Sequence, residues 1–165
     1  MASRHTDVQV GDVLSLDPGT AVSGVALWRD GSLVATSALK SPNGYTATVS
    51  ERLKEIVGQL DTFLTAHDAW VQIVICENPP HTLLKAVIGA VLVSPRVNSM
   101  FSDGHTVAVM TWKSWARAHG AGGPFKDIKG VKALKATGFP VPPGIGDDEA
   151  DSILVYLAYR DRQKK

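Results

Sequence analysis

The stretch that decides the fold is Val13-Leu14-Ser15-Leu16-Asp17-Pro18-Gly19-Thr20-Ala21-Val22-Ser23-Gly24-Val25-Ala26-Leu27-Trp28. Two apolar runs flank a Pro-Gly turn, which is typical of two antiparallel strands joined by a loop. The first run ends on Asp17, and a carboxylate there is costly to bury unless a cation, a metal ion or hydrogen-bond donors pair with it. An Asp that only caps the turn is the alternative, and this stretch alone does not decide between them. Gly24 would let a ligand or another backbone approach closely.

Length and composition indicate one globular domain. The chain has 165 residues, of which 44% are apolar and 20% charged, so we expect a leader over 1–11 and a single domain over 12–162. The apolar runs are too short to cross a membrane, and the polar N-terminus predicts no signal peptide. Cys76 is the sole cysteine, which excludes an intrachain disulfide. We therefore expect a cytoplasmic protein with Cys76 as a buried apolar side chain.

Basic residues are concentrated in one part of the chain, although the net charge is only +1. A basic segment near clustered acids would suit a phosphate polymer held against a metal site. A solvated helix face is the alternative explanation. Only Asp127 opposes the basic residues of this segment, which are Lys113, Arg117, Lys126, Lys129, Lys132 and Lys135.

The pattern of apolar residues predicts an α/β fold in which a mixed five-stranded sheet carries helices on both faces. Asp30-Gly31 is a strong hairpin signal. The helical region over 82–101, interrupted near Pro95, is apolar nearly all round, so it is either deep core or half of a subunit interface. Strands are predicted over 12–17, 24–29, 33–39, 71–77 and 106–110, and the other helices over 48–66, 111–117 with Thr111 as its cap, 125–137 and 147–160.

Acidic residues stand where these elements begin or end. Asp17 ends the first strand and Glu77 the fourth, so parallel neighbouring strands would bring both to one sheet edge. Asp148 and Asp151 are three apart and share a helix face, although spacing alone equally allows Asp147 with Asp151. Several carboxylates in one place need cations, and hard oxygen ligands select Mg²⁺ or Mn²⁺. Two such ions could activate water and stabilise the leaving oxygen of a phosphodiester.

Three motifs resemble the metal-binding motifs of RuvC-type Holliday-junction resolvases, which belong to the RNase H-like superfamily. They are Leu16-Asp17-Pro18-Gly19-Thr20-Ala21-Val22-Ser23-Gly24, Ile75-Cys76-Glu77 and Asp148-Glu149-Ala150-Asp151-Ser152-Ile153. The resemblance spans roughly 13–159 and implies an RNase H-like fold. It further implies that Asp17, Glu77, Asp148 and Asp151 bind two Mg²⁺ ions per site, for which Mn²⁺ can substitute, and catalyse symmetric cutting of four-way DNA junctions.

The resemblance also assigns further roles. Lys113 matches a basic residue after the fifth strand, and Lys126 matches a catalytic lysine after a Gly-containing loop. Arg117 and Lys129 join these two lysines as predicted nucleic-acid-binding residues. The 82–101 helix would form a homodimer. Because the family's paired acids are separated by two residues, the match selects Asp148 with Asp151 and leaves Asp147 to cap the last helix.

One departure concerns the segment after Glu77, which is short and reads Asn78-Pro79-Pro80-His81. Bacterial members have a longer segment here with an aromatic that touches junction bases. The chain is in this respect more similar to compact phage-encoded relatives, which would act in the host cytoplasm. We expect weak sequence preference, because base readout needs side chains that reach the bases.

Other functions are compatible with parts of the pattern. The Asp17-Pro18-Gly19-Thr20 motif resembles the first phosphate loop of actin-like ATPases and sugar kinases, but these need two such domains. A non-catalytic junction-binding protein would not need the carboxylates, which repel DNA unless metal is bound. An RNase H-like nuclease for other branched DNA or RNA–DNA hybrids remains the main alternative.

Overall fold

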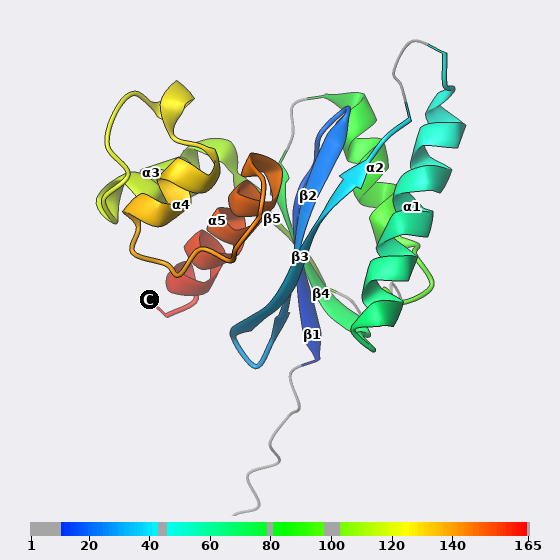
Figure 1. The fold of residues 1–165 in the computed structure, drawn as a ribbon, viewed down its shortest axis with the longest axis horizontal. Helices are drawn as coiled ribbons and strands as arrows, with labels where there is room; N and C mark the ends of the chain where they lie inside the picture. The colour runs from blue at the N-terminus through cyan, green and yellow to red at the C-terminus, as the bar shows by residue number, and fades with distance from the viewer. Residues whose placement is uncertain (1–10, 43–45, 79–80, 98–102, 165) are drawn as a thin grey trace, which may run out of the picture.

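A computed structural model describes residues 11–42, 46–78, 81–97 and 103–164, so the predicted leader lies almost wholly outside the described residues. A mixed five-stranded sheet, in the order β3-β2-β1-β4-β5, stands between two layers of helices (Figure 1). The sheet and helix arrangement confirms the predicted fold class. The strands are β1 Asp12–Asp17, β2 Val22–Arg29, β3 Ser32–Lys40, β4 Val71–Asn78 and β5 Asp103–Ala108, and the helices are α1 Val49–Ala66, α2 Thr82–Leu92, α3 Val109–Ala118, the short 3₁₀ helix η1 Phe125–Asp127, α4 Gly130–Ala136 and α5 Asp147–Arg162.

Strand β1 lies at the centre of the sheet. It pairs antiparallel with β2, where Asp17 lies opposite Gly24, and parallel with β4, where Leu16 lies opposite Cys76. The parallel pairing confirms that the first and fourth strands end at the same edge. Strands β2 and β3 extend beyond their predicted bounds because each continues to find ladder partners, with Val22 opposite Lys40.

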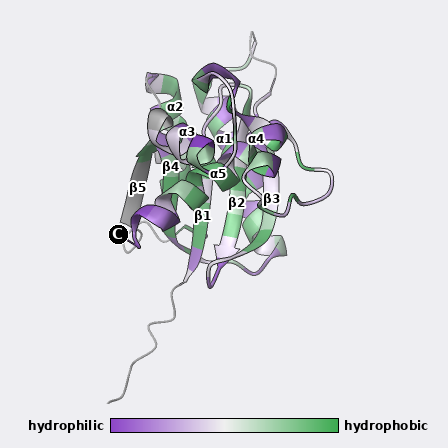
Figure 2. Ribbon diagram, turned by 90° about the vertical axis from the view of Figure 1, so that its left-hand side faces the viewer, coloured by the Kyte–Doolittle hydropathy of each residue, from purple (hydrophilic) through white to green (hydrophobic). Residues whose placement is uncertain are grey.

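Alternation along the strands separates two hydrophobic cores. Leu14 and Leu16 face α1 and α2, whereas Val13 faces the layer of α3, α4 and α5. Figure 2 looks onto this second layer, with the apolar strands behind it. Cys76 is 2% exposed in the first core, as predicted. Within the described residues, no helix combines the length and apolarity needed to span a membrane.

Two predicted elements around the fifth strand are wrong in their bounds. Helix α2 ends at Leu92, and the interruption predicted near Pro95 is confirmed, because a proline ring cannot join the helical hydrogen-bond ladder. The helix does not resume through Val97, and residues 98–101 of the predicted region lie outside the described residues. Strand β5 ends at Ala108, opposite the last residue of β4. Helix α3 therefore starts at Val109, and Thr111 is not its cap.

The C-terminal helices also differ from prediction. The expected 125–137 helix is divided into η1 and α4, because Gly130 has a φ of +66°, which no helix interior tolerates. Helix α5 starts at Asp147 and extends to Arg162. Its cap is Gly146, whose N–H donates to Glu149 Oε2 at 2.7 Å. The prediction that Asp147 caps α5 is therefore wrong.

Candidate metal and nucleic-acid site

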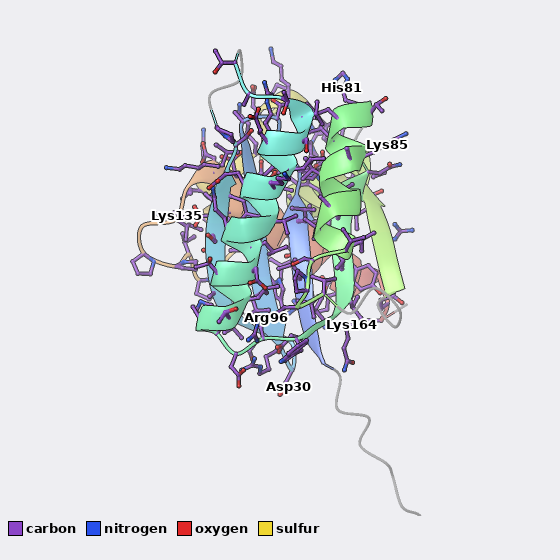
Figure 3. The ribbon with its side chains drawn as sticks, turned by 90° about the vertical axis from the view of Figure 1, so that its right-hand side faces the viewer. Asp30, His81, Lys85, Arg96, Lys135 and Lys164 are labelled. Carbon is purple, nitrogen blue, oxygen red and sulfur yellow. The ribbon has the colours of Figure 1, made fainter. Side chains whose placement is uncertain are left out.

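Two carboxylates lie at the end of the sheet where β1 and β4 finish. Asp17 is the last residue of β1, and Glu77 follows Cys76, which pairs with Leu16. Because side chains alternate along a strand, both acids lie on the same face of the sheet as Val13, which is the face covered by the layer that contains α5. Figure 3 marks this end of the molecule by His81, which follows β4, and the opposite end by Asp30.

Helix α5 brings two more carboxylates to the same place. Asp148 and Asp151 lie in its first turns, and the helix packs on β1 and β2. A Cβ on Gly24 would lie 1.8 Å from the backbone oxygen of Asp148. Because Gly24 pairs with Asp17, its missing side chain lets the start of α5 lie directly against the strand beside Asp17. Of the two explanations for Gly24, the structure supports close approach of another backbone.

The electrostatics show that the four acids influence one another. Burial raises the pKa of Asp17 to about 8, and the charges of Asp151, Glu77 and Asp148 add to the rise. Burial likewise raises the pKa of Asp151 to about 7, against the lowering effect of a hydrogen bond from Gly130. The pKa values of Glu77 and Asp148 are also raised, mainly by burial. The ionised forms of these acids are therefore disfavoured unless positive charge lies close to them.

Hydrogen bonds hold two of the acids from outside the acidic motifs. Trp112 Nε1 donates to Glu77 Oε2 at 2.5 Å, and the Gly130 N–H donates to Asp151 Oδ1 at 2.6 Å. Sequence reasoning missed both donors. Trp112 has only the pattern of a core aromatic, although its place beside Lys113 puts it next to a predicted site residue. Gly130 within a lysine-rich segment offers no comparable signal.

Asp147 caps a different helix from the one predicted. Its Oδ1 accepts from the Val131 N–H at 2.9 Å, at the start of α4. A Cβ on Gly130 would lie 2.1 Å from the same oxygen. Asp147 and Asp151 thus hold the first turn of α4 against α5, and a side chain at position 130 would disrupt this contact.

Among the predicted basic residues, Lys113 lies close to the acids. Lys113 is half-buried, and its charge lowers the pKa values of Asp17, Glu77 and Asp151. Its Nζ lies 5.3 Å from the Trp112 ring centroid. The structure thus brings Lys113 to the acids.

Lys126, Arg117 and Lys129 are not brought to the acids in the same way. Lys126 in η1 and Lys129 before α4 are exposed. Neither lysine contributes to the pKa shifts of the four acids. Arg117 donates to the Gly123 carbonyl at 2.5 Å and stacks 4.0 Å from the Phe125 ring centroid. Arg117 therefore holds the glycine-containing loop.

The donor chemistry fits a hard divalent cation, because all four side chains supply carboxylate oxygens and their charge is only partly offset by Lys113. As the side chains stand in the described ranges, no three His, Cys, Asp or Glu form a group ready to hold an ion. Glu77 and Asp151 are held instead by Trp112 and Gly130. The acids are neighbours without being a closed coordination shell.

Comparison with solved structures identifies the fold. Two structures of RuvC from Thermus thermophilus match with a TM-score of 0.62, each over 93% of this chain and 95% of their own. Their identities are 16% and 17%, and the former is a complex with a Holliday junction substrate. No family model and no curated protein matches the sequence. The chain therefore has the RuvC fold that its three motifs predict.

Proposed function

We propose that the chain is a Mg²⁺-dependent endonuclease that resolves four-way DNA junctions. The observation that carries the proposal is the gathering of Asp17, Glu77, Asp148 and Asp151 at one sheet end, where burial and the charges of the other three acids raise the pKa of Asp17. A fold shared with RuvC along nearly the whole chain supports the same function.

The four carboxylates would hold two Mg²⁺ ions, which supply an activated water and stabilise the leaving oxygen. The chain's own residues prepare the site. Trp112 and the Gly130 backbone hold Glu77 and Asp151, and Lys113 offsets part of the negative charge. The exposed Lys126 and Lys129 would bind DNA phosphates, since attraction of this kind needs charge rather than exact placement.

We further propose that two copies associate through α2 and the adjoining face of α1, because a two-fold substrate suits a two-fold enzyme. Val93 at the end of α2 is 73% exposed, and Val49 at the start of α1 is 52% exposed. An open hollow lined by Val49, Leu53, Val57 and Pro95 lies on this face, which is turned toward the viewer in Figure 3.

A panel of labelled substrates with Mg²⁺ tests the function. We expect paired, symmetric cuts in four-way junctions, and little cutting of three-way junctions, flaps or RNA–DNA hybrids. Asp17→Asn and Glu77→Gln should bind junctions but not cut them, because binding depends on basic residues. Preferred cutting of hybrids or flaps would point to the alternative RNase H-like nuclease. Light scattering of the same samples should give a dimer, and a monomer with and without DNA would contradict the paired arrangement.

A further inference from the structure

We propose that Trp112 is a positioning residue for the cation site, because its indole N–H fixes the orientation of the Glu77 carboxylate. The inference rests on the proposed metal-dependent function. It assigns a role to a residue outside the acidic motifs, on an element that contributes no carboxylate to the site.

The contact is short and has little room to move. Trp112 Nε1 donates to Glu77 Oε2 at 2.5 Å, which is shorter than the usual N–H···O distance, and a charged acceptor favours such short contacts. The Trp112 side chain is 2% exposed and belongs to the core beneath α5, together with Ala116 and Ile128. Turning the indole away would therefore require repacking of this core.

The topology explains why a tryptophan reaches this position. Val107 in β5 pairs with Glu77 in β4, and α3 begins only two residues after Val107. The first turn of α3 therefore stands beside the end of β4, and the long indole spans the gap to Oε2. A lysine could also span it, but it would neutralise the carboxylate that a cation needs.

An indole N–H suits this task because it only donates and carries no charge. It occupies one oxygen of Glu77 and leaves Oε1 for a cation. Lys113, the next residue, provides the positive charge separately. The two adjacent side chains thus have separate roles: Trp112 orients the Glu77 carboxylate, and Lys113 offsets part of its negative charge.

The same helix provides a matched control. Trp115 Nε1 donates to Asp161 Oδ2 at 2.9 Å, so it makes the same kind of contact away from the four acids. Trp115→Phe removes an indole–carboxylate hydrogen bond from α3 without touching Glu77. A purely structural role for Trp112 predicts that Trp112→Phe and Trp115→Phe differ only in thermal midpoint.

Titration calorimetry with Mn²⁺ alone, in the absence of DNA, provides the decisive comparison. Loss of a partner that orients a metal ligand commonly weakens metal binding by about 10- to 100-fold. We expect Trp112→Phe to bind Mn²⁺ about tenfold more weakly than the wild type, whereas Trp115→Phe should bind it equally well. Equal Mn²⁺ affinity in the wild type and folded Trp112→Phe would overturn the proposal.

A second measurement needs no substitution at Trp112 and covers the case in which that variant does not fold. In ¹⁵N-labelled wild type, addition of Mg²⁺ should shift the indole N–H signal of Trp112. The Trp115 signal, identified by its loss in Trp115→Phe, should stay in place. If saturating Mg²⁺ moves no indole signal, Trp112 does not position the ligand.

The two proposals fail in different ways. If Mn²⁺ binding depends on Trp112 but the wild type cuts no junction, the positioning role stands and the proposed substrate is wrong. If the wild type cuts junctions and Trp112→Phe binds Mn²⁺ normally, the substrate stands and the positioning role is wrong.

Discussion

Asp147 has the position of an ordinary helix cap in the sequence, but it caps α4 instead of its own helix α5. It lies in the first turn of α5, yet its carboxylate accepts from the Val131 N–H of α4. Asp147→Asn should have little effect, because the amide oxygen accepts the same bond. Asp147→Ala should lose about 1 kcal/mol of stability, as helix caps do. Thermal midpoints and Mg²⁺-dependent cleavage separate the roles: an Asp147→Asn variant that is folded but inactive would instead place Asp147 among the metal ligands.

Lys113 and Lys126 should respond differently to substitution, because only Lys113 acts on the charge of the acids. We expect Lys113→Ala to slow cleavage by about tenfold or more, in line with loss of an electrostatic contact at a reacting group. Lys126→Ala should mainly weaken junction binding and reduce its salt dependence.

Lys135 offers a control for this comparison, as an exposed lysine of α4 that Figure 3 shows pointing away from the sheet. Single-turnover rates and junction affinities at two salt concentrations would separate the two lysines. Equal loss of the single-turnover rate in Lys113→Ala and Lys126→Ala would restore the catalytic role first assigned to Lys126.

At the scale of elements, the approach of α5 to β2 depends on Gly24. A Cβ there would overlap the backbone of Asp148, so Gly24→Ala must push the first turn of α5 away. We expect a loss of about 1–3 kcal/mol of stability, typical of overpacking, together with weaker Mg²⁺ binding. Gly58→Ala in α1 is the control, because a Cβ meets no atom within 4 Å there and the helix should gain about 1 kcal/mol. Urea unfolding and calorimetry would detect both effects, and a Gly24→Ala variant as stable as the wild type would contradict the packing argument.

The elements that could be predicted from the sequence are those whose pattern is local. The apolar runs predicted strands that end on Asp17 and Glu77, but that both acids lie at one edge followed only if the strands are parallel neighbours, a pairing that the structure supplies. The bounds of β5 could not be predicted, because they depend on where its partner β4 ends. The same limit applies to Trp112 and Gly130, whose donors meet acids 35 and 21 residues away. Such contacts exist only once the sheet and α5 are assembled.

At the scale of the whole molecule, the buried acids make stability depend on pH. The pKa values of Asp17 and Asp151 are about 8 and 7 in the folded chain, above the value of 3.8 expected when unfolded. The folded state therefore keeps protons that the unfolded chain releases, so their contribution to stability is full below about pH 4 and is lost as the pH rises toward 8. Urea unfolding of the metal-free protein should show this loss.

One variant identifies the source of the pH dependence. Asp17→Asn should flatten the fall and stabilise the metal-free protein above pH 7 by at least about 1 kcal/mol, since one pKa unit corresponds to about 1.4 kcal/mol. Asp12 should act in the opposite direction, because its hydrogen bonds to Arg29 lower its pKa and stabilise the fold until the pH falls through that lowered value. If Asp17→Asn leaves the profile unchanged, the acids do not interact as strongly as described.

The bond from the Gly130 N–H to Asp151 Oδ1 joins the acidic site to the start of α4, directly after Lys129. A Mg²⁺ ion bound to this oxygen as proposed would compete with the Gly130 N–H for it, so cation binding and DNA binding at the start of α4 would be thermodynamically linked. Linkage is reciprocal: whatever factor Mg²⁺ applies to the affinity for junction DNA, the junction must apply to the affinity for Mg²⁺. The affinity for junction DNA should be measured with and without the cation, and the affinity for the cation with and without the junction, with Ca²⁺ replacing Mg²⁺ to prevent cutting. Equal changes in the two affinities would demonstrate the linkage. If the cation leaves the affinity for junction DNA unchanged, and the junction leaves the affinity for the cation unchanged, the two binding events are independent.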